Sequence, residues 1–325
     1  MKLNIEFSKN DNFLFYFIRC FFLLIFFVSN LILLLFLQKR KITSKNPTLL
    51  IKFQTTFDLL AIFAVCSSNF KEESDFRTSN VHYLYFYCYI WLNNGLFWVF
   101  SVVSVYLMVL ISFDRFVCIV FSIYYKAVTL RILILLVIIS ICFGSLVGIS
   151  YAFFVEIKPT NGTVNGTDQQ LYMCNIPVDF FNTIIYCVFY SLLPLILISS
   201  FNITSVTFLI KHIKTQKSLN VENQNSSGKK LIVRFSMATF IGTSTYGIII
   251  AIDSLIYILE ALKLTLLINT EYYFYYNIFI CSCLTFVNPF IYVILFSKFR
   301  MFIRDIFSRN LFVNTLPKYY PSQTN

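Results

Sequence analysis

Seven apolar segments, each long enough to cross a lipid bilayer, are the feature that most constrains this chain. A transmembrane helix needs about 20 largely apolar residues, and such segments occur at 20–37, 48–68, 92–113, 131–154, 182–210, 232–257 and 272–296. Because backbone groups in lipid must pair within the chain, each segment is predicted to be a helix. The expected fold class is therefore all-α, a bundle of seven transmembrane helices.

The composition agrees with a chain that lies almost wholly in the membrane. Hydrophobic residues make up 58% of the 325 residues, charged residues only 13%, and the mean hydropathy is +0.74. We expect an extracellular N-terminus at 1–19, a transmembrane domain at 20–296, an amphipathic membrane-surface helix at 297–309 and a disordered cytoplasmic tail at 310–325. In the surface helix, phenylalanines and isoleucines recur at helical spacing opposite lysines and arginines.

The distribution of positive charge predicts the orientation. Lys and Arg gather after the first span, between the third and fourth, between the fifth and sixth, and after the seventh, whereas the other connections are mixed or acidic. Cytoplasmic loops carry the positive charge, so the N-terminus is predicted to lie outside. The net charge of +11 then reflects topology and attraction to anionic membrane lipid, and it is a poor indication of nucleic-acid binding. Arg19, at the outer rim of the first span, is expected to snorkel towards water.

The seventh span ends in Asn288-Pro289-Phe290-Ile291-Tyr292. Pro289 has no backbone N–H and therefore frees a carbonyl one turn back, which a neighbouring polar group must satisfy. Asn288 is well placed to do so. The alternative is a chance Asn-Pro pair in an apolar helix.

The third span carries Asp114-Arg115-Phe116 at its cytoplasmic end. A carboxylate in this place can hold the arginine until another group offers partners, since a guanidinium presents a rigid fork of donors. An ordinary ion pair at a span boundary is the alternative.

With these two motifs in this order, the chain resembles rhodopsin-like G-protein-coupled receptors along most of its length, and the run 111–118 is similar to muscarinic and histamine receptors. The resemblance implies a plasma-membrane receptor, with no enzymatic activity, that binds an extracellular ligand and activates a heterotrimeric G protein. It assigns coupling and switching to Asp114, Arg115, Asn288, Pro289 and Tyr292.

Asp58 lies in the middle of the second span, where a charged side chain costs roughly 2.5–3.5 kcal/mol on insertion scales. It should therefore be paired or functional. The resemblance places Asn30, Ser104 and Asn288 beside it in a polar network that often binds sodium. The alternative is that these groups only satisfy one another and hold helices together. No other cofactor or metal is expected.

The sixth span departs from the family pattern. It reads Phe240-Ile241-Gly242-Thr243-Ser244-Thr245-Tyr246-Gly247, where the family shows a tryptophan and a proline after the phenylalanine. A switch that works through a proline kink must then use Gly242 or Gly247 for flexibility, or be altered.

The sequence says more about which ligands are absent than about which one binds. Amine receptors anchor the ammonium with an aspartate in span three, but counting from Arg115 reaches Phe97 and counting from Cys88 reaches Gly95. The counts differ because the segment is two residues longer, and neither gives a carboxylate. The outer half of the bundle supplies eight candidates for a ligand pocket: Asn94, Phe97, Trp98, Tyr186, Asp253, Tyr257, Tyr273 and Tyr276. Asp253 is the strongest, because an acid within a membrane span usually faces the interior of the bundle. The aromatic members could instead be packing or an interfacial belt.

The connection between spans four and five contains two glycosylation sequons, at Asn161 and Asn165, and Cys174. Cys88 precedes span three on the same predicted outer side, where the compartment is oxidising. We therefore expect a disulfide between Cys88 and Cys174. The other seven cysteines fall in spans or at their ends and are expected to be free.

A polytopic transporter or channel is the alternative function. It should show paired broken helices or inverted halves around a midplane site, and two span prolines at unrelated positions, Pro194 and Pro289, argue against it. A membrane enzyme would need a cluster of reactive side chains, and Asp58 has no second acid near it.

The predicted orientation implies that Asn161 and Asn165 carry glycans. Digestion of the mature protein with a glycosidase should increase its gel mobility, and changing both residues to Gln should abolish that shift. Asn225, a sequon on the predicted cytoplasmic side, serves as the control and should contribute nothing when changed to Gln. An unmodified mature protein would contradict the prediction.

Overall fold

The computed structural model describes residues 9–39, 45–68, 81–92, 94–125, 130–152, 156–164, 167–175, 184–218, 226–262 and 270–312. Seven of its helices are long and apolar enough to span a membrane, which confirms the predicted fold class. They are α1 (Lys9–Lys39), α2 (Lys45–Ser68), α4 (Gly95–Val120), α6 (Leu130–Ala152), α8 (Leu193–Ser218), α9 (Ser226–Ala261) and α10 (Thr270–Leu295).

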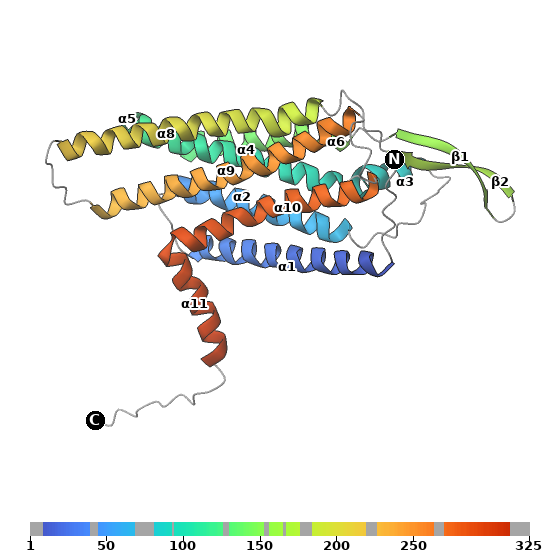
Figure 1. Cartoon of the computed structure of the whole chain (residues 1–325), viewed down its shortest axis with the longest axis horizontal. Coiled ribbons are helices and arrows are strands. Elements are labelled where there is room, and N and C mark those ends of the chain that lie inside the picture. Colours follow the sequence, from blue (N-terminus) through green and yellow to red (C-terminus); the bar gives the residue numbers. More distant parts are fainter. Residues whose placement is uncertain are drawn as a thin grey trace.

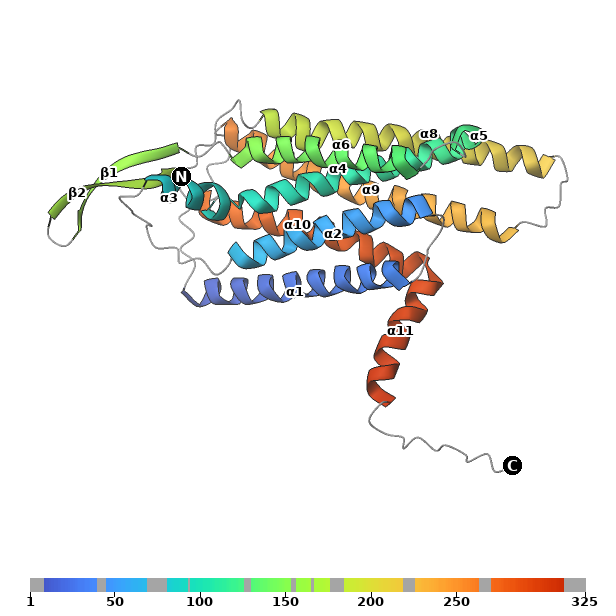
Figure 2. The same ribbon diagram turned by 180° about the vertical axis from the view of Figure 1, so that it is seen from behind.

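Shorter elements extend or connect these helices. They are α3 (Val81–Phe86) and the π-helix η1 (Tyr87–Leu92) before α4, α5 (Ser122–Tyr125) after it, strands β1 (Glu156–Val164) and β2 (Thr167–Asn175), the π-helix η2 (Tyr186–Leu192) before α8, and α11 (Ser297–Phe312). The strands project beyond one end of the bundle, and α11 leaves the other end at a steep angle (Figures 1 and 2).

The helix α4 is the centre of the bundle. It contacts α2, α6, α8 and α9, and 72% of its most apolar window is buried, compared with 22% for α6. Two glycines let α6 approach it closely: a Cβ at Gly148 would lie 2.6 Å from the Cα of Val99, and one at Gly144 would lie 2.9 Å from the Cα of Val103. This small-xxx-small pattern is typical of closely packed membrane helices.

The first helix is longer than the hydropathy indicated. It begins at Lys9, inside the segment predicted to be a separate extracellular N-terminus, because polar residues at its start do not prevent helix formation. Arg19 consequently lies roughly 15 Å from the start of the helix, and only 2% of it is exposed. The expectation that Arg19 snorkels to water is wrong.

A β-hairpin between the fourth and fifth spans was not predicted. β1 and β2 pair antiparallel, from Glu156 opposite Asn175 to Val164 opposite Thr167. Asn165 and Gly166, which separate the strands, lie outside the described residues. Asn-Gly is the preferred pair for a two-residue hairpin loop, so the signal was present in the sequence. The fold thus adds one hairpin to the helical bundle; Asn161 lies on β1, and its glycosylation stays a prediction.

Cys88 lies in η1, is fully buried and is disulfide-bonded, whereas the seven cysteines expected to be free are free. The predicted partner, Cys174, lies on β2, and its side chain is outside the described part of the structure. The pairing therefore stays a prediction, but α3, which leads directly into η1, contacts β2.

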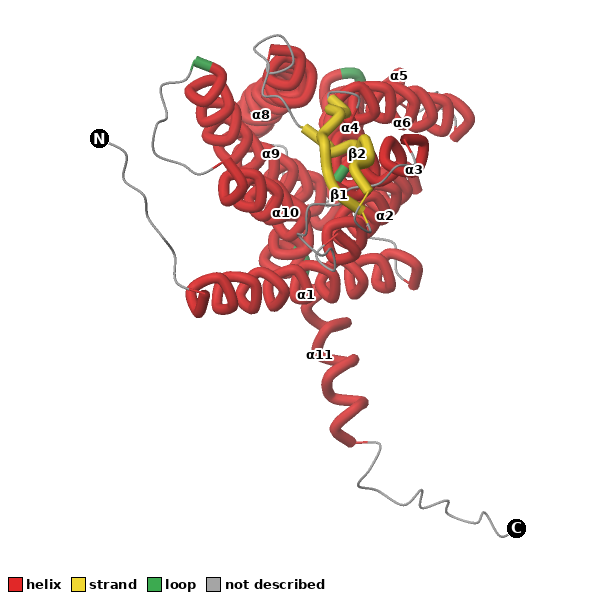
Figure 3. Tube along the Cα trace, turned by 90° about the vertical axis from the view of Figure 1, so that its right-hand side faces the viewer, coloured by secondary structure: helices red, strands yellow, loops and turns green. Residues whose placement is uncertain are grey.

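The surface helix α11 docks against the first span. Phe299 is 1% exposed, and its ring centroid lies 4.9 Å from that of Phe36 on α1. Arg300 donates from Nη1 to the carbonyl of Val293 at 3.1 Å and also to that of Ile294. These contacts satisfy carbonyls at the end of α10 and hold the start of α11 beside α1. In the end view of Figure 3, α11 points away from the bundle past α1.

Candidate functional site

The Asp114–Arg115 pair at the end of α4 is buried. Arg115 donates from Nε to Asp114 Oδ2 at 3.0 Å and forms a second, shorter bond from Nη2 to the same oxygen. The other carboxylate oxygen accepts a hydrogen bond from the Tyr125 hydroxyl at 2.9 Å. Asp114 and Arg115 are only 5% and 4% exposed. The pair and Tyr125 therefore form one hydrogen-bonded cluster in which the two charged side chains are shielded from solvent.

Tyr125 lies on α5, beyond the membrane-spanning part of α4. Its hydrogen bond to Asp114 links α5 to the Asp114–Arg115 pair. Burial raises the pKa of its phenol, and the Asp114 carboxylate raises that pKa further. Tyr125 therefore stays protonated and remains a donor to Asp114. Tyr292 of α10 lies within the range of the charge of Arg115.

Asp58 joins three helices in the middle of the bundle. Ser104 of α4 donates from its hydroxyl to Asp58 Oδ1 at 2.5 Å, and Asn288 of α10 donates from Nδ2 to Oδ2 at 3.4 Å. Asp58 is 3% exposed. The structure thus brings together three of the four residues that the resemblance placed in a polar network.

Asn30, the fourth residue expected in the polar network, bonds elsewhere. It makes no hydrogen bond to Asp58; its Nδ2 donates to the carbonyl of Thr285 at 3.0 Å. Thr285 precedes Pro289 by four residues, so this carbonyl is the one the proline leaves without a helical donor. The expectation that Asn288 would satisfy it is wrong, because the Asn288 amide is directed to Asp58. A residue of α1 satisfies the carbonyl instead.

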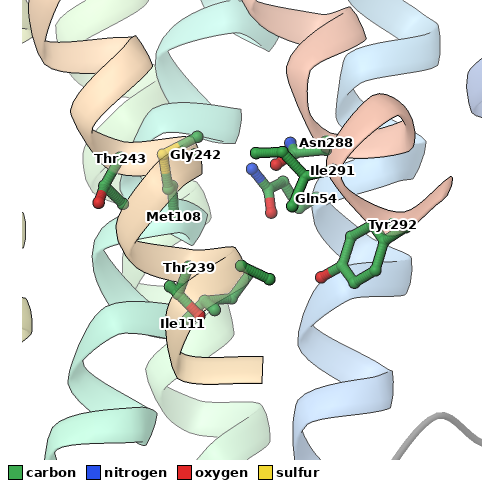
Figure 4. A pocket seen from close by; sticks show the side chains of 10 residues that line it. Gln54, Met108, Ile111, Thr239, Gly242, Thr243, Asn288, Ile291 and Tyr292 are labelled. Atoms are coloured by element: carbon green, nitrogen blue, oxygen red, sulfur yellow. The ribbon is translucent and has the colours of Figure 1, made fainter. Parts of the chain in front are cut away.

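A cavity adjoins the Asp58 network at Asn288. On α4 it is lined by Met108 and Ile111, which lie between Ser104 and Arg115 along the helix, and Figure 4 shows its lining. Its volume is small, about 20 Å³, which is room for roughly one water molecule. Its lining comes from α2, α4, α9 and α10. Gln54 projects into it and is 3% exposed, and its Nε2 has no hydrogen-bond partner. The remaining polar lining is Thr239, Thr243, Asn288 and Tyr292. Sequence analysis missed Gln54, although a polar residue one turn before Asp58 was a usable signal.

The buried face of α9 differs from the face that the family pattern indicated. Phe240, taken as the family phenylalanine, is 42% exposed. The inward face instead carries Thr243, Tyr246 and Asp253, which are all buried. Asn202 of α8 donates from Nδ2 to the Thr243 hydroxyl at 2.9 Å, so it contacts the sixth span.

The glycines of α9 serve close packing. A Cβ at Gly247 would lie 2.7 Å from Leu195 Cδ1, and one at Gly242 would lie 3.2 Å from Ile291 Cδ1. Both positions are contacts with neighbouring helices, α8 and α10, so the absence of a side chain lets those helices approach α9.

The outer end of the third span is interrupted, which explains the two-residue discrepancy there. Asn94 has φ 51° and separates η1 from α4. Asparagine tolerates this left-handed conformation better than most residues. The segment from Cys88 to Gly95 is thus no continuous α-helix, and counting along it by helical turns cannot locate a ligand anchor.

The ligand-pocket candidates are partly described. Asn94, Phe97, Trp98 and Asp253 are all buried, with at most 4% of any one exposed. The side chains of Tyr186, Tyr257, Tyr273 and Tyr276 lie outside the described residues. Within the described part, no group of three or more His, Cys, Asp or Glu side chains could hold a metal ion.

The comparisons with known proteins agree with this architecture. The family described as "7 transmembrane receptor (rhodopsin family)" matches residues 28–292. The crystal structure of squid rhodopsin superposes with a TM-score of 0.64 over 93% of this chain and 88% of that chain, at 15% sequence identity. No curated protein sequence matches the chain.

The Asn30 contact predicts a loss of stability on substitution. Asn30→Leu removes the donor to the Thr285 carbonyl and leaves that carbonyl buried and unpaired, which should lower the free energy of unfolding by about 1–3 kcal/mol. Thermal unfolding in detergent, followed by a thiol-reactive dye, measures the effect. Ser29→Ala is the matched control, because the Ser29 hydroxyl bonds only within α1, to the carbonyl of Phe26. Equal losses in both variants would contradict the assignment.

Proposed function

Because the chain belongs to the rhodopsin family of seven-transmembrane receptors, we propose that this multi-pass membrane protein resides in the plasma membrane with its N-terminus outside, binds an extracellular ligand and activates a heterotrimeric G protein. The observation that carries the proposal is the buried Asp114–Arg115 pair at the predicted cytoplasmic end of α4. The family is one of receptors, and the assignment leaves the transporter alternative without support.

The proposed coupling step transfers the donors of Arg115 from one partner to another. At rest Asp114 occupies Nε and Nη2. Movement of the helices that line the cavity would open the space above Arg115 and let its guanidinium swing out. An inserted helix end of the G protein would then offer backbone carbonyls, which suit the fork of a guanidinium better than the point charge of a lysine.

An exposed apolar surface beside this group supports a docking role. Ile123 and Tyr124 of α5 are 81% and 73% exposed, and the next residue, Tyr125, bonds to Asp114. Large apolar side chains exposed together are typical of interaction sites. A partner that covers α5 would therefore also act on the hydrogen bond between Tyr125 and Asp114.

Loss of Arg115 should abolish signalling through G proteins. Asp114→Asn removes the charge that holds Arg115 and should raise ligand-independent second-messenger production in transfected cells. Adding Arg115→Ala to that background should return production to the level of untransfected cells. Arg131→Ala, which removes an exposed arginine near the start of α6, is the control and should change little. Undiminished signalling by the double variant at equal surface density would refute G-protein coupling through Arg115.

An amine is disfavoured as the extracellular ligand, because the outer half of span three offers no carboxylate. Sodium is proposed as an ion bound inside the bundle. Asp58 and Ser104 present oxygen atoms side by side at one buried point, and hard cations prefer oxygen ligands. Asp58 would supply the negative charge and Ser104 a hydroxyl oxygen. Asn288 directs its Nδ2 to Asp58, so its amide would have to turn over to offer Oδ1 to the ion.

Sodium should therefore stabilise the parent protein through Asp58. An ion that binds only the folded state adds about 2.7 kcal/mol at 100 times its Kd. Thermal unfolding in sodium chloride, compared with potassium chloride at equal ionic strength, should show higher stability for the parent and no difference for Asp58→Asn, which keeps the shape but loses the charge. Asp305→Asn, at an exposed acid of α11, should retain the sodium effect. A parent insensitive to sodium would reduce Asp58 to helix packing.

A further inference from the structure

At the junction between η2 and α8, two consecutive carbonyls lose the donor that a regular α-helix would give them. The N–H of Leu193 bonds the carbonyl of Val188, five residues back. This shift takes the N–H of Leu193 away from the carbonyl of Phe189, its partner four residues back in an α-helix. The carbonyl of Tyr190 would be served by the N–H of residue 194, but Pro194 has none.

Two tyrosine hydroxyls from other helices donate hydrogen bonds to these two carbonyls. Tyr106 of α4 donates to the carbonyl of Phe189 at 2.7 Å, and Tyr246 of α9 donates to the carbonyl of Tyr190 at 3.1 Å. Tyr246 is 1% exposed, so water does not replace its hydroxyl. Three helices are thereby joined through the backbone break in the fifth span.

The position of Tyr246 gives this contact a further meaning. Ala238, Thr239, Gly242 and Thr243, one to two turns before it on α9, line the cavity above Arg115. A change in the rotation or tilt of α9 that widens this cavity must also displace Tyr246 relative to η2. Since Arg115 is held by Asp114 here, the Tyr246 bond belongs to the resting arrangement.

We propose that Tyr246 is the positioning residue that holds α9 in the resting state, in place of the tryptophan and proline absent from span six, through its hydrogen bond to the Tyr190 carbonyl, whose α-helical donor Pro194 cannot supply. The proposal rests on the proposed receptor function. The bond also faces the ligand side: the Tyr190 hydroxyl lies 3.2 Å from Ser101 Oγ, and its ring packs edge-on against Trp98 with centroids 5.8 Å apart. A ligand that displaces Trp98 would move the residue whose carbonyl Tyr246 holds.

The test removes the hydroxyl and keeps the ring. Tyr246→Phe should raise ligand-independent signalling per receptor at the cell surface by about fivefold or more, the change expected when one buried carbonyl of the resting state loses its donor. Tyr106→Phe is the matched control, because it removes an equivalent hydroxyl bond from α4 and leaves the tie to α9 intact. It should leave basal signalling within about twofold of the parent.

A second measurement works without a G protein. Spin labels at Ile123→Cys and Met237→Cys, in a chain whose exposed Cys20 and Cys142 are replaced by serine, report the distance between α5 and the cytoplasmic half of α9. Tyr246→Phe should add a longer-distance population, and Tyr106→Phe should not. Pro194→Ala returns a backbone donor to the Tyr190 carbonyl. In this background Tyr246→Phe should add less of the longer-distance population. The double variant also allows the test if Tyr246→Phe alone does not reach the cell surface.

The outcomes separate the two proposals. A shifted distance distribution without increased signalling would support Tyr246 as the residue that holds α9 and contradict G-protein coupling. An unchanged distribution, or equal changes in Tyr246→Phe and Tyr106→Phe, would overturn the role proposed for Tyr246, whatever the receptor signals through.

Discussion

The structure depends on one constraint: inside a bilayer every backbone carbonyl needs a donor, and water is not there to provide it. Pro194 and Pro289 break the helical ladder in the fifth and seventh spans. The freed carbonyls are satisfied across the bundle, by Asn30 for the seventh span and by Tyr106 and Tyr246 at the fifth. Each break thus becomes an interhelical tie whose loss would leave a buried carbonyl unpaired.

These ties and the other polar contacts converge on α4. At successive depths it binds η2 through Ser101 and Tyr106, α2 through Ser104, and the Asp114–Arg115–Tyr125 group at its end. The glycines of α6 bring that helix close to its outer half. Because α4 makes contacts at each of these depths, it links the proposed ligand side to the proposed coupling site. A displacement of α4 at the ligand side can therefore reach the coupling site through these contacts.

Between the Asp58 network and the arginine, the interior is neither filled with apolar side chains nor fully paired. The cavity lined by Gln54, Asn288 and Tyr292 occupies this level, and Asn288 links it directly to Asp58. Its α9 wall carries small residues, Ala238 and Gly242, which leave space that larger side chains would fill. Tyr246 and Asn202 hold this wall to the fifth span, so they limit how far the cavity can open.

Hydropathy and contacts between adjacent residues are local properties, so the number of spans, their approximate limits and the Asp114–Arg115 pair could be predicted from the amino-acid sequence. The sequence also held the signal for the hairpin, Asn165-Gly166 between its strands. Helix packing was needed to show that Asn30, and not Asn288, satisfies the Thr285 carbonyl, and that Tyr246 faces inward while Phe240 faces out. The reason is that polar and apolar residues are spread around all sides of α9, so periodicity does not mark its buried face. The partner of a freed carbonyl is set by how neighbouring helices are rotated, and that rotation is a property of the packed bundle.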